Sequence, residues 1–131
     1  MSIKQIKGLF AVAACYDIGA GLIFCLFYMP LYRAMNLILP EHPGYLQLAS
    51  LYIAVFGIGF AFVARSPESN MGVIVLGILM KIVFAGVIFY HYFVTIAPKI
   101  YVVFALCDAI FAALFLGAYR SLSGVQREAS G

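Results

Sequence analysis

Long apolar runs alternate with short polar connections along this chain. The runs cover residues 8–29, 46–64, 72–94 and 100–119, and each is close to the roughly 20 residues that a helix needs to cross the hydrocarbon core of a bilayer. Little of the chain is left over for a soluble domain. The pattern predicts an all-α polytopic membrane protein, in which four transmembrane helices form an antiparallel bundle as a single domain over residues 1–131.

The connections between the runs are short, except for the one that follows the first run. Between Pro30 and Pro40 apolar residues recur near helical spacing, which predicts a short helix lying in the membrane interface between spans 1 and 2. The segment from Pro40 to Gly44 predicts a rigid turn into the second span. Residues 121–131 are polar and small, and we expect them to form a cytoplasmic tail without regular structure.

Composition supports the membrane assignment, because 66% of the residues are hydrophobic and 10% are charged. A soluble domain of this size would not show such values. The first run is longer than the roughly 7 to 15 apolar residues of a signal peptide, and no small-residue cleavage site follows it. The net charge of +3 comes without a basic cluster, so the composition does not indicate nucleic-acid binding.

Basic residues at the ends of the runs predict the orientation in the membrane. Lys and Arg outside the bilayer favour the cytoplasmic side, and an even number of spans puts both termini on one side. We therefore expect cytoplasmic N- and C-termini in a cell inner membrane. The basic residues on the side of the termini are Lys4, Lys7, Arg65, Arg120 and Arg127, and those on the opposite side are Arg33 and Lys99.

Three ionisable residues interrupt the apolar runs: Asp17, Lys81 and Asp108. They lie about ten, nine and eleven residues from the cytoplasmic ends of their spans, which at a rise of 1.5 Å per residue places them at one level near the midplane. An unpaired charge there costs about 2.5 to 3.5 kcal/mol even on a lenient insertion scale, so mutual pairing is predicted.

One lysine against two aspartates leaves a net charge of minus one in this intramembrane charge cluster. We expect one carboxyl group to be protonated, or the two to share a proton. Two interpretations stay open. The cluster either responds to pH or to a bound cation, or it only fixes the register of the helices, as a buried polar group can.

Small residues recur at spacings of three and four around these charges, and transmembrane helices pack through such close approaches. This pattern turns both aspartates toward the bundle interior and leaves Phe, Ile, Leu and Val for the lipid-facing surface. Tyr16 and Tyr52 lie deep enough to donate hydrogen bonds to the cluster. The predicted helix-packing residues are Ala13, Gly21, Ala54, Gly57, Ala61, Gly77, Ala105 and Ala112.

The remaining candidate residues lie near the outer ends of the spans. His42 and His91 could contact a ligand or cofactor such as haem, although two histidines, one of them in a loop, are a poor haem signature and hydrogen bonding at the interface explains them better. Six tyrosines are typical of an aromatic belt: Tyr28, Tyr32, Tyr45, Tyr90, Tyr92 and Tyr101. The three cysteines lie inside spans without a CxxC pair, so we expect neither a disulfide framework nor a metal site. Because no catalytic or cofactor-binding motif is found, we expect no enzyme activity, no catalytic residues and no cofactor.

Several short motifs occur over the second to fourth spans. They are Pro43–Gln47, the run Val55–Phe60 that continues to Pro67, the run Leu76–Lys81, and Cys107–Asp108. Their order and spacing resemble those of a group of small four-helix bacterial membrane proteins, loosely similar to the DoxX-like family.

In that group the lysine usually follows a glycine and the aspartate an asparagine, whereas this chain has Met80 and Cys107 at those positions. The resemblance implies a compact four-helix fold in a bacterial cytoplasmic membrane. It also marks Lys81 and Asp108 as the positions that match the charged pair of the family. It implies no activity.

Three functions fit these features. The first is an accessory or scaffold subunit of a membrane complex or homo-oligomer, which suits the short loops and the small-residue helix faces. An alternative is a proton-coupled or small-solute transporter that works as an oligomer, because transport sites lie near the midplane. A second alternative is a lipid, quinone or haem binder at the outer interface. The expected partners are the lipid bilayer and other membrane-protein chains.

Overall fold

The computed structural model describes residues 1–95 and 98–130, with side chains through Val125, so that Gly131 lies outside the described residues. All regular structure in these ranges is helical, which confirms the predicted all-α class. In chain order the helices are α1 (Ile3–Leu26), α2 (Tyr28–Ala34), α3 (Gly44–Arg65), the 3-10 turn η1 (Glu68–Asn70), α4 (Met71–Val94) and α5 (Lys99–Ser130).

Four helical stretches are long and apolar enough to cross a membrane, as the sequence predicts. They are Ile3–Ala34, Gly44–Arg65, Glu68–Val94 and Lys99–Val125. Many large apolar side chains on these stretches are exposed on the outer surface, as expected where the solvent is lipid. The fold is that of a multi-pass membrane protein in contact with the bilayer.

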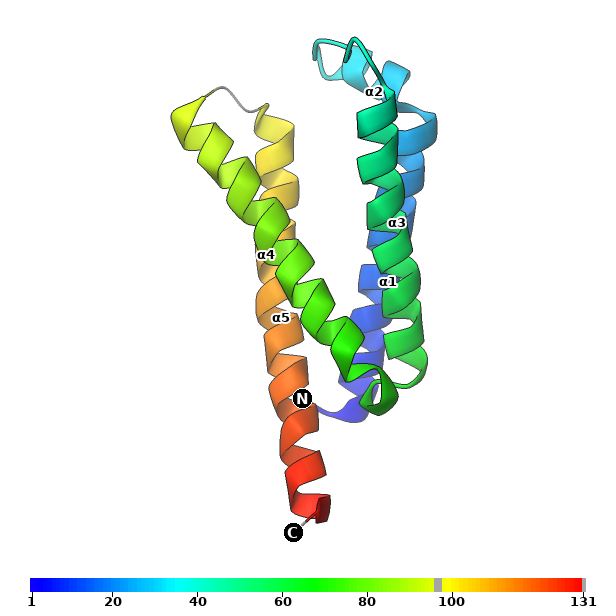
Figure 1. Ribbon diagram of the computed structural model, residues 1–131, viewed down its shortest axis with the longest axis vertical. Coiled ribbons are helices and arrows are strands. Elements are labelled where there is room, and N and C mark those ends of the chain that lie inside the picture. The colour runs from blue at the N-terminus through cyan, green and yellow to red at the C-terminus, as the bar shows by residue number, and fades with distance from the viewer. Residues whose placement is uncertain (96–97, 131) are drawn as a thin grey trace.

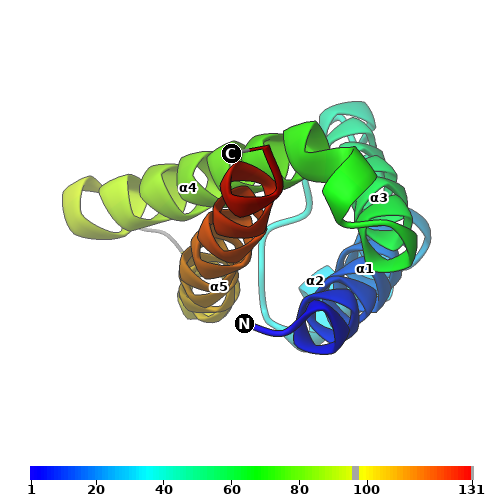
Figure 2. The same cartoon turned by 90° about the horizontal axis from the view of Figure 1, so that it is seen from below.

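The four long helices are arranged as two pairs, in which α1 packs beside α3 and α4 packs beside α5 (Figure 1). The pairs approach each other at the end of the molecule that holds the N-terminus, and they diverge toward the end that holds α2 (Figure 1). We call these the terminal end and the α2 end. Seen from the terminal end, the beginning of α4 lies next to α3, where the chain passes from one pair to the other (Figure 2).

Helix α1 begins at Ile3, five residues before the predicted span, because its N-terminus is capped. The Ser2 hydroxyl accepts a hydrogen bond from the Gln5 backbone N–H at 3.3 Å, and the Gln5 side chain accepts one from the Ser2 backbone N–H at 2.8 Å. This reciprocal capping box satisfies two backbone donors that the helix itself leaves free. At its other end α1 stops at Leu26, and α2 starts directly after Phe27.

Helix α5 continues through residues 121–130, where the sequence analysis expects an irregular tail. Leu122 is only 4% exposed and continues the buried stripe of Phe115 and Ala118 at helical spacing. The N-terminal ammonium group of Met1 also donates a hydrogen bond to the Ser121 hydroxyl at 2.9 Å. The start of the tail is therefore part of the packed core. The polar composition of the segment does not predict this packing.

An aromatic core joins the two helix pairs at the terminal end. Phe10 of α1 stacks on Phe115 of α5 with ring centroids 4.4 Å apart, and Phe60 of α3 meets Phe115 edge-on at 5.0 Å. All three rings and Ile74 of α4 are fully buried. The assignment of Phe and Ile to the lipid-facing surface is thus wrong for these four residues, because the close approach of the pairs leaves no room for lipid between them.

Most of the predicted helix-packing residues lie between helices. Of the alanines, Ala61 is only partly buried, whereas Ala13, Ala54, Ala105 and Ala112 are buried. Gly21 and Gly57 are buried at the contact between α1 and α3, and Gly77 lies against the Phe60 ring. The tight contact within the α1 and α3 pair thus lies at Gly21 and Gly57.

Candidate functional site

The three ionisable residues of the spans meet in one buried cluster. The Lys81 ammonium donates hydrogen bonds to Asp17 Oδ1 at 2.6 Å and to Asp108 Oδ1 at 2.8 Å. Lys81 is 1% exposed, Asp17 0% and Asp108 5%. Because the lysine comes from α4 and the aspartates from α1 and α5, the charge cluster links one helix pair to the other.

Small neighbours on each helix make room for these side chains. Asp17 lies one turn from the buried Ala13 and Gly21, and Lys81 lies one turn from the buried Gly77 and Ala85. A helical residue shares its face with residues three and four positions away, so each charge lies on the stripe where its helix approaches a neighbour. The long lysine side chain can then extend between helices to reach both carboxylates.

Aromatic rings surround the Lys81 ammonium on its remaining sides. Its nitrogen lies 5.2 Å from the ring centroid of Tyr16, 5.4 Å from that of Phe111 and 6.0 Å from that of Phe60. A ring face within about 6 Å attracts a cation. Tyr16, predicted to donate a hydrogen bond, therefore contacts the cluster through its ring, and no hydrogen bond joins its hydroxyl to the cluster in the described part of the chain.

The prediction that Tyr52 donates a hydrogen bond to the cluster is wrong. Tyr52 is 61% exposed and points away from the other helices. Ser50, Ala54 and Gly57 face α1, and a residue two positions from Ser50 is turned by about 200° around the helix axis. Tyr52 was predicted from its depth in the membrane alone. The position of a residue around the helix axis determines which way its side chain points.

The two histidines lie apart from the charge cluster. His42 is exposed, and its Nδ1 accepts a hydrogen bond from the Gly44 backbone at 3.4 Å. His91 is also exposed, with its Nδ1 3.3 Å from the Thr95 hydroxyl. Each histidine thus finds its partner within its own segment, and neither lines the two cavities described below. Their contact with a ligand or cofactor stays a prediction.

Among the described residues, one fully buried oxygen of the cluster lacks a hydrogen-bond partner. Asp17 Oδ2 is buried and makes no hydrogen bond to any described residue. An ionised carboxylate accepts hydrogen bonds at both oxygens, and leaving a buried acceptor unsatisfied costs about 1 to 3 kcal/mol. Asp17 therefore has unused capacity to bind a donor that comes from outside the protein.

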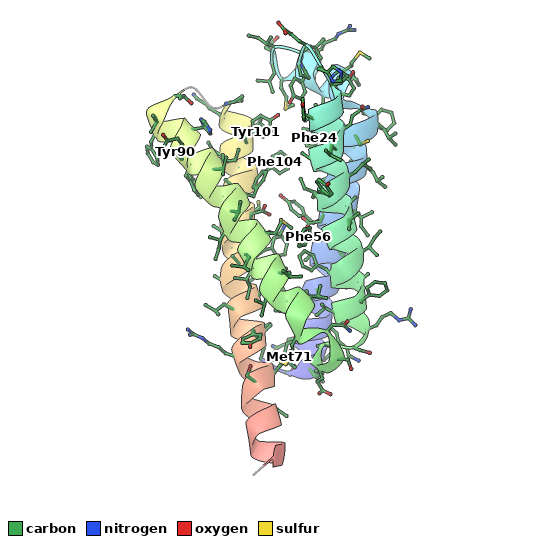
Figure 3. All side chains as sticks on the ribbon, viewed as in Figure 1. Phe24, Phe56, Met71, Tyr90, Tyr101 and Phe104 are labelled. Atoms are coloured by element: carbon green, nitrogen blue, oxygen red, sulfur yellow. The ribbon has the colours of Figure 1, made fainter. Side chains whose placement is uncertain are left out.

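A cavity of about 130 Å³ lies between the charge cluster and the α2 end, and we call it the inner cavity. Both aspartates line it, and Leu46 and Tyr101, near the starts of α3 and α5, extend it toward the α2 end. Figure 3 shows Phe104 and Tyr101 of α5 and Phe24 of α1 at the level where the two helix pairs diverge. Five of the lining residues are aromatic: Tyr16, Phe24, Phe84, Tyr101 and Phe104.

A second cavity of about 390 Å³ adjoins the first, and we call it the apolar groove. It runs between α1, α2 and α5, and part of its wall is formed by Leu31 of α2, Met35 directly after α2, and Ile100 of α5. The two cavities have four lining residues in common, which are Tyr16, Ala20, Phe24 and Phe104. The inner cavity with its two carboxylates thus lies next to an apolar space between the helices, with the four shared side chains bordering both.

Helix α2 borders the apolar groove at the α2 end. The hydroxyl groups of Tyr32 in α2 and Tyr101 in α5 lie 2.6 Å apart and form a hydrogen bond. Tyr101 also lines the inner cavity. Both tyrosines belong to the predicted aromatic belt, and the sequence carries no signal for this pairing, because the two residues lie 69 positions apart.

The fold and the site define a small multi-pass helical membrane protein with an ion cluster buried between its spans. Comparisons of the chain with known protein families, with curated proteins and with solved structures find no match. The resemblance to the DoxX-like family stays a prediction, and the function has to be argued from the site itself.

Proposed function

We propose that this protein is a proton-coupled transporter of a small solute, which binds in the inner cavity at the charge cluster. The observation that carries the proposal is Asp17 Oδ2, a buried carboxylate oxygen without a partner beside a cavity. Ionisable residues inside transmembrane spans mark ion and substrate pathways, and the sites of transporters lie near the midplane. A cluster that only fixed helix register would have no need of a buried carboxylate oxygen without a hydrogen-bond partner.

The net charge of the cluster can couple the movement of protons to the movement of the solute. With all three groups ionised, one lysine and two aspartates sum to minus one. A low-dielectric interior penalises such an excess charge, so either a proton or a cationic solute at the carboxylates relieves it. Competition between the two for one site couples their movements.

The arrangement of the helices supports access from one side. The pairs diverge at the α2 end (Figure 1), whereas the Phe10, Phe60 and Phe115 rings close the terminal end. This form corresponds to a state open toward the α2 end. The opposite state then requires the aromatic core to separate while the helix pairs move together around Tyr101.

We place the protein as an antiparallel four-helix bundle in a bacterial inner membrane, with both termini in the cytoplasm and the inner cavity open to the outer side. The unequal distribution of Lys and Arg supports this orientation. Helix α2 then lies in the outer interface, which suits its lack of buried residues and its last-turn Arg33.

The flux of protons into proteoliposomes tests the transporter. We expect wild-type protein to admit protons when a mixture of small amines, alcohols and carboxylates is trapped inside the vesicles, because a solute and a proton that compete for one site are exchanged across the membrane. Asp17→Asn or Asp108→Asn should reduce this flux at least about tenfold, because each removes an ionisable group of the cluster. A pH-sensitive dye trapped inside the vesicles reports the flux.

The control for this measurement is Glu68→Gln, which removes an exposed carboxylate between α3 and α4, away from the cluster. It should transport like the wild type. Absence of flux in the wild type, or equal flux in the wild type and the aspartate variants, would contradict the proposal.

A second candidate function is that of an accessory or scaffold subunit, and the outer faces of the helices favour it. Gly8 on α1 and Gly72 and Gly86 on α4 are exposed and have no neighbouring atom within 4 Å of the place where a Cβ would stand. Small residues on an outer face permit close approach of another helix, from a second copy of the chain or from a different protein.

Native mass spectrometry of the protein, extracted from its own membrane in mild detergent, separates these partners. The transporter proposal predicts a homo-oligomer without other chains, since four helices are few for a complete pathway. A foreign chain present at fixed stoichiometry would instead make the protein an accessory subunit and would name its complex.

A further inference from the structure

We propose that the ligand of the inner cavity is an organic ammonium ion with an aromatic or alkyl group. Its ammonium group binds next to Asp17 Oδ2, and its apolar part extends into the apolar groove. This inference rests on the proposed function, because it names the class of solute that the same site takes.

The head group follows from hydrogen bonding and charge. Asp17 Oδ2 is a buried acceptor that lacks a donor, and Lys81 already donates to Asp17 Oδ1 and Asp108 Oδ1. An ammonium group supplies both the missing donor and the positive charge that balances the cluster. A neutral alcohol supplies only the donor, and a carboxylate brings a further negative charge into a site that already has two.

The walls of the inner cavity also favour a cation. Five of its lining residues are aromatic, and an ammonium group is attracted to the face of such rings. Tyr16 already presents its ring to Lys81 at 5.2 Å, whereas Phe24, Phe84 and Phe104 are not among the rings that contact the Lys81 ammonium. Organic ammonium ions are recognised by carboxylates and by the faces of aromatic rings, and the inner cavity has both.

The volumes indicate how large the apolar part is. The inner cavity measures about 130 Å³, and an apolar cavity of about 150 Å³ holds one benzene molecule. One ring therefore fills the inner cavity. Because the apolar groove of about 390 Å³ has Phe24 and Phe104 in common with it, a substituent on the ring can continue between α1, α2 and α5.

Binding of three probes with the same ring tests the head group. Benzylammonium, benzyl alcohol and benzoate are titrated into the protein in lipid nanodiscs, with an empty nanodisc as the reference for partitioning. We expect benzylammonium to bind at least about tenfold more tightly than benzyl alcohol, and benzoate not to compete with it. Equal affinities of the ammonium and the alcohol in the wild type would overturn the proposal, whatever the variants do.

Asp17→Asn tests the binding residue, because asparagine keeps the shape of the side chain and removes its charge. It should lose the tenfold preference for benzylammonium, whereas Glu68→Gln should keep it. A preference that survives in folded Asp17→Asn would also overturn the proposal.

A second pair of measurements tests the apolar groove. Adding a butyl group to the 4-position of benzylammonium should increase the affinity about tenfold or more. Gly19 lines the groove and has open space where a Cβ would stand, so Gly19→Leu should fill the groove and abolish this gain while benzylammonium itself still binds. A gain that is the same in Gly19→Leu as in the wild type would show that the tail lies elsewhere.

These outcomes separate the ligand from the transport proposal. Selective ammonium binding without any proton flux would uphold the ligand class and contradict the transporter. Proton flux that depends on Asp17, without selective ammonium binding, would uphold the transporter and overturn the ligand class.

Discussion

Replacing both aspartates of the charge cluster by asparagine, with Lys81 intact, is expected to destabilise the protein more than replacing the lysine by methionine. Lys81 is 1% exposed and has Asp17 and Asp108 as its ionic partners. Breaking a buried ion pair by removing one partner typically costs about 3 to 5 kcal/mol, because an uncompensated charge is left behind. In Lys81→Met the two carboxyl groups can instead take up protons and become neutral.

Thermal unfolding of the variants in one detergent measures this ranking. The triple variant Asp17→Asn, Lys81→Met and Asp108→Asn serves as the control, because it removes all three charges and should recover most of the stability that the double variant loses. If Lys81→Met proves to be the least stable of the set, or if the three substitutions are additive, the cluster is not one energetic unit.

The charge cluster could be predicted from the sequence because membrane depth is a strong constraint. Asp17, Lys81 and Asp108 each interrupt an apolar run at about the same distance from its predicted cytoplasmic end, and isolated charges at that depth are costly. Pairing was therefore the economical arrangement, and the structure brings the three side chains within hydrogen-bonding distance. The same constraint failed for Tyr52, since the level of a residue in the membrane does not determine its direction around the helix.

The aromatic core and the cavities could not be predicted in this way. In a membrane protein the lipid and the interior are both apolar. The residue type of a phenylalanine such as Phe115 therefore does not indicate whether its side chain faces the lipid or the interior. The inner cavity arises because the helix pairs diverge toward the α2 end (Figure 1), and this divergence depends on packing between segments far apart in the chain. The pairing of Tyr32 with Tyr101 depends on it too.

The proposed transport depends on a difference between the packing inside a helix pair and the packing between the two pairs. The contact between α1 and α3 is tight, because Gly21 and Gly57 let the two backbones meet. The two helix pairs are joined less continuously, by the aromatic core at the terminal end and by the cluster near the middle. Movement of one rigid pair against the other can thus change access to the cluster without disturbing the packing inside a pair.

Gly21→Ala and Gly57→Ala are expected to disrupt the α1 and α3 pair. A Cβ at Gly21 would stand 2.8 Å from the Ala54 backbone nitrogen, and a Cβ at Gly57 would stand 2.8 Å from the Ile18 backbone nitrogen. Real Cβ atoms essentially never approach so closely, and a backbone cannot rotate away as a side chain can. Overpacking usually costs about 1 to 3 kcal/mol, and we expect the upper part of this range because two helices must separate.

Gly19→Ala is the matched control, since Gly19 lies two residues from Gly21 on the same helix and has open space where its Cβ would stand. Alanine favours a helix over glycine by about 1 kcal/mol in water, so this variant should melt at or slightly above the wild-type temperature. The same substitution thus acts in opposite directions within one turn of α1. Equal melting temperatures for Gly19→Ala and Gly21→Ala would contradict the close contact of α1 with α3, and with it the view that each helix pair moves as a rigid unit.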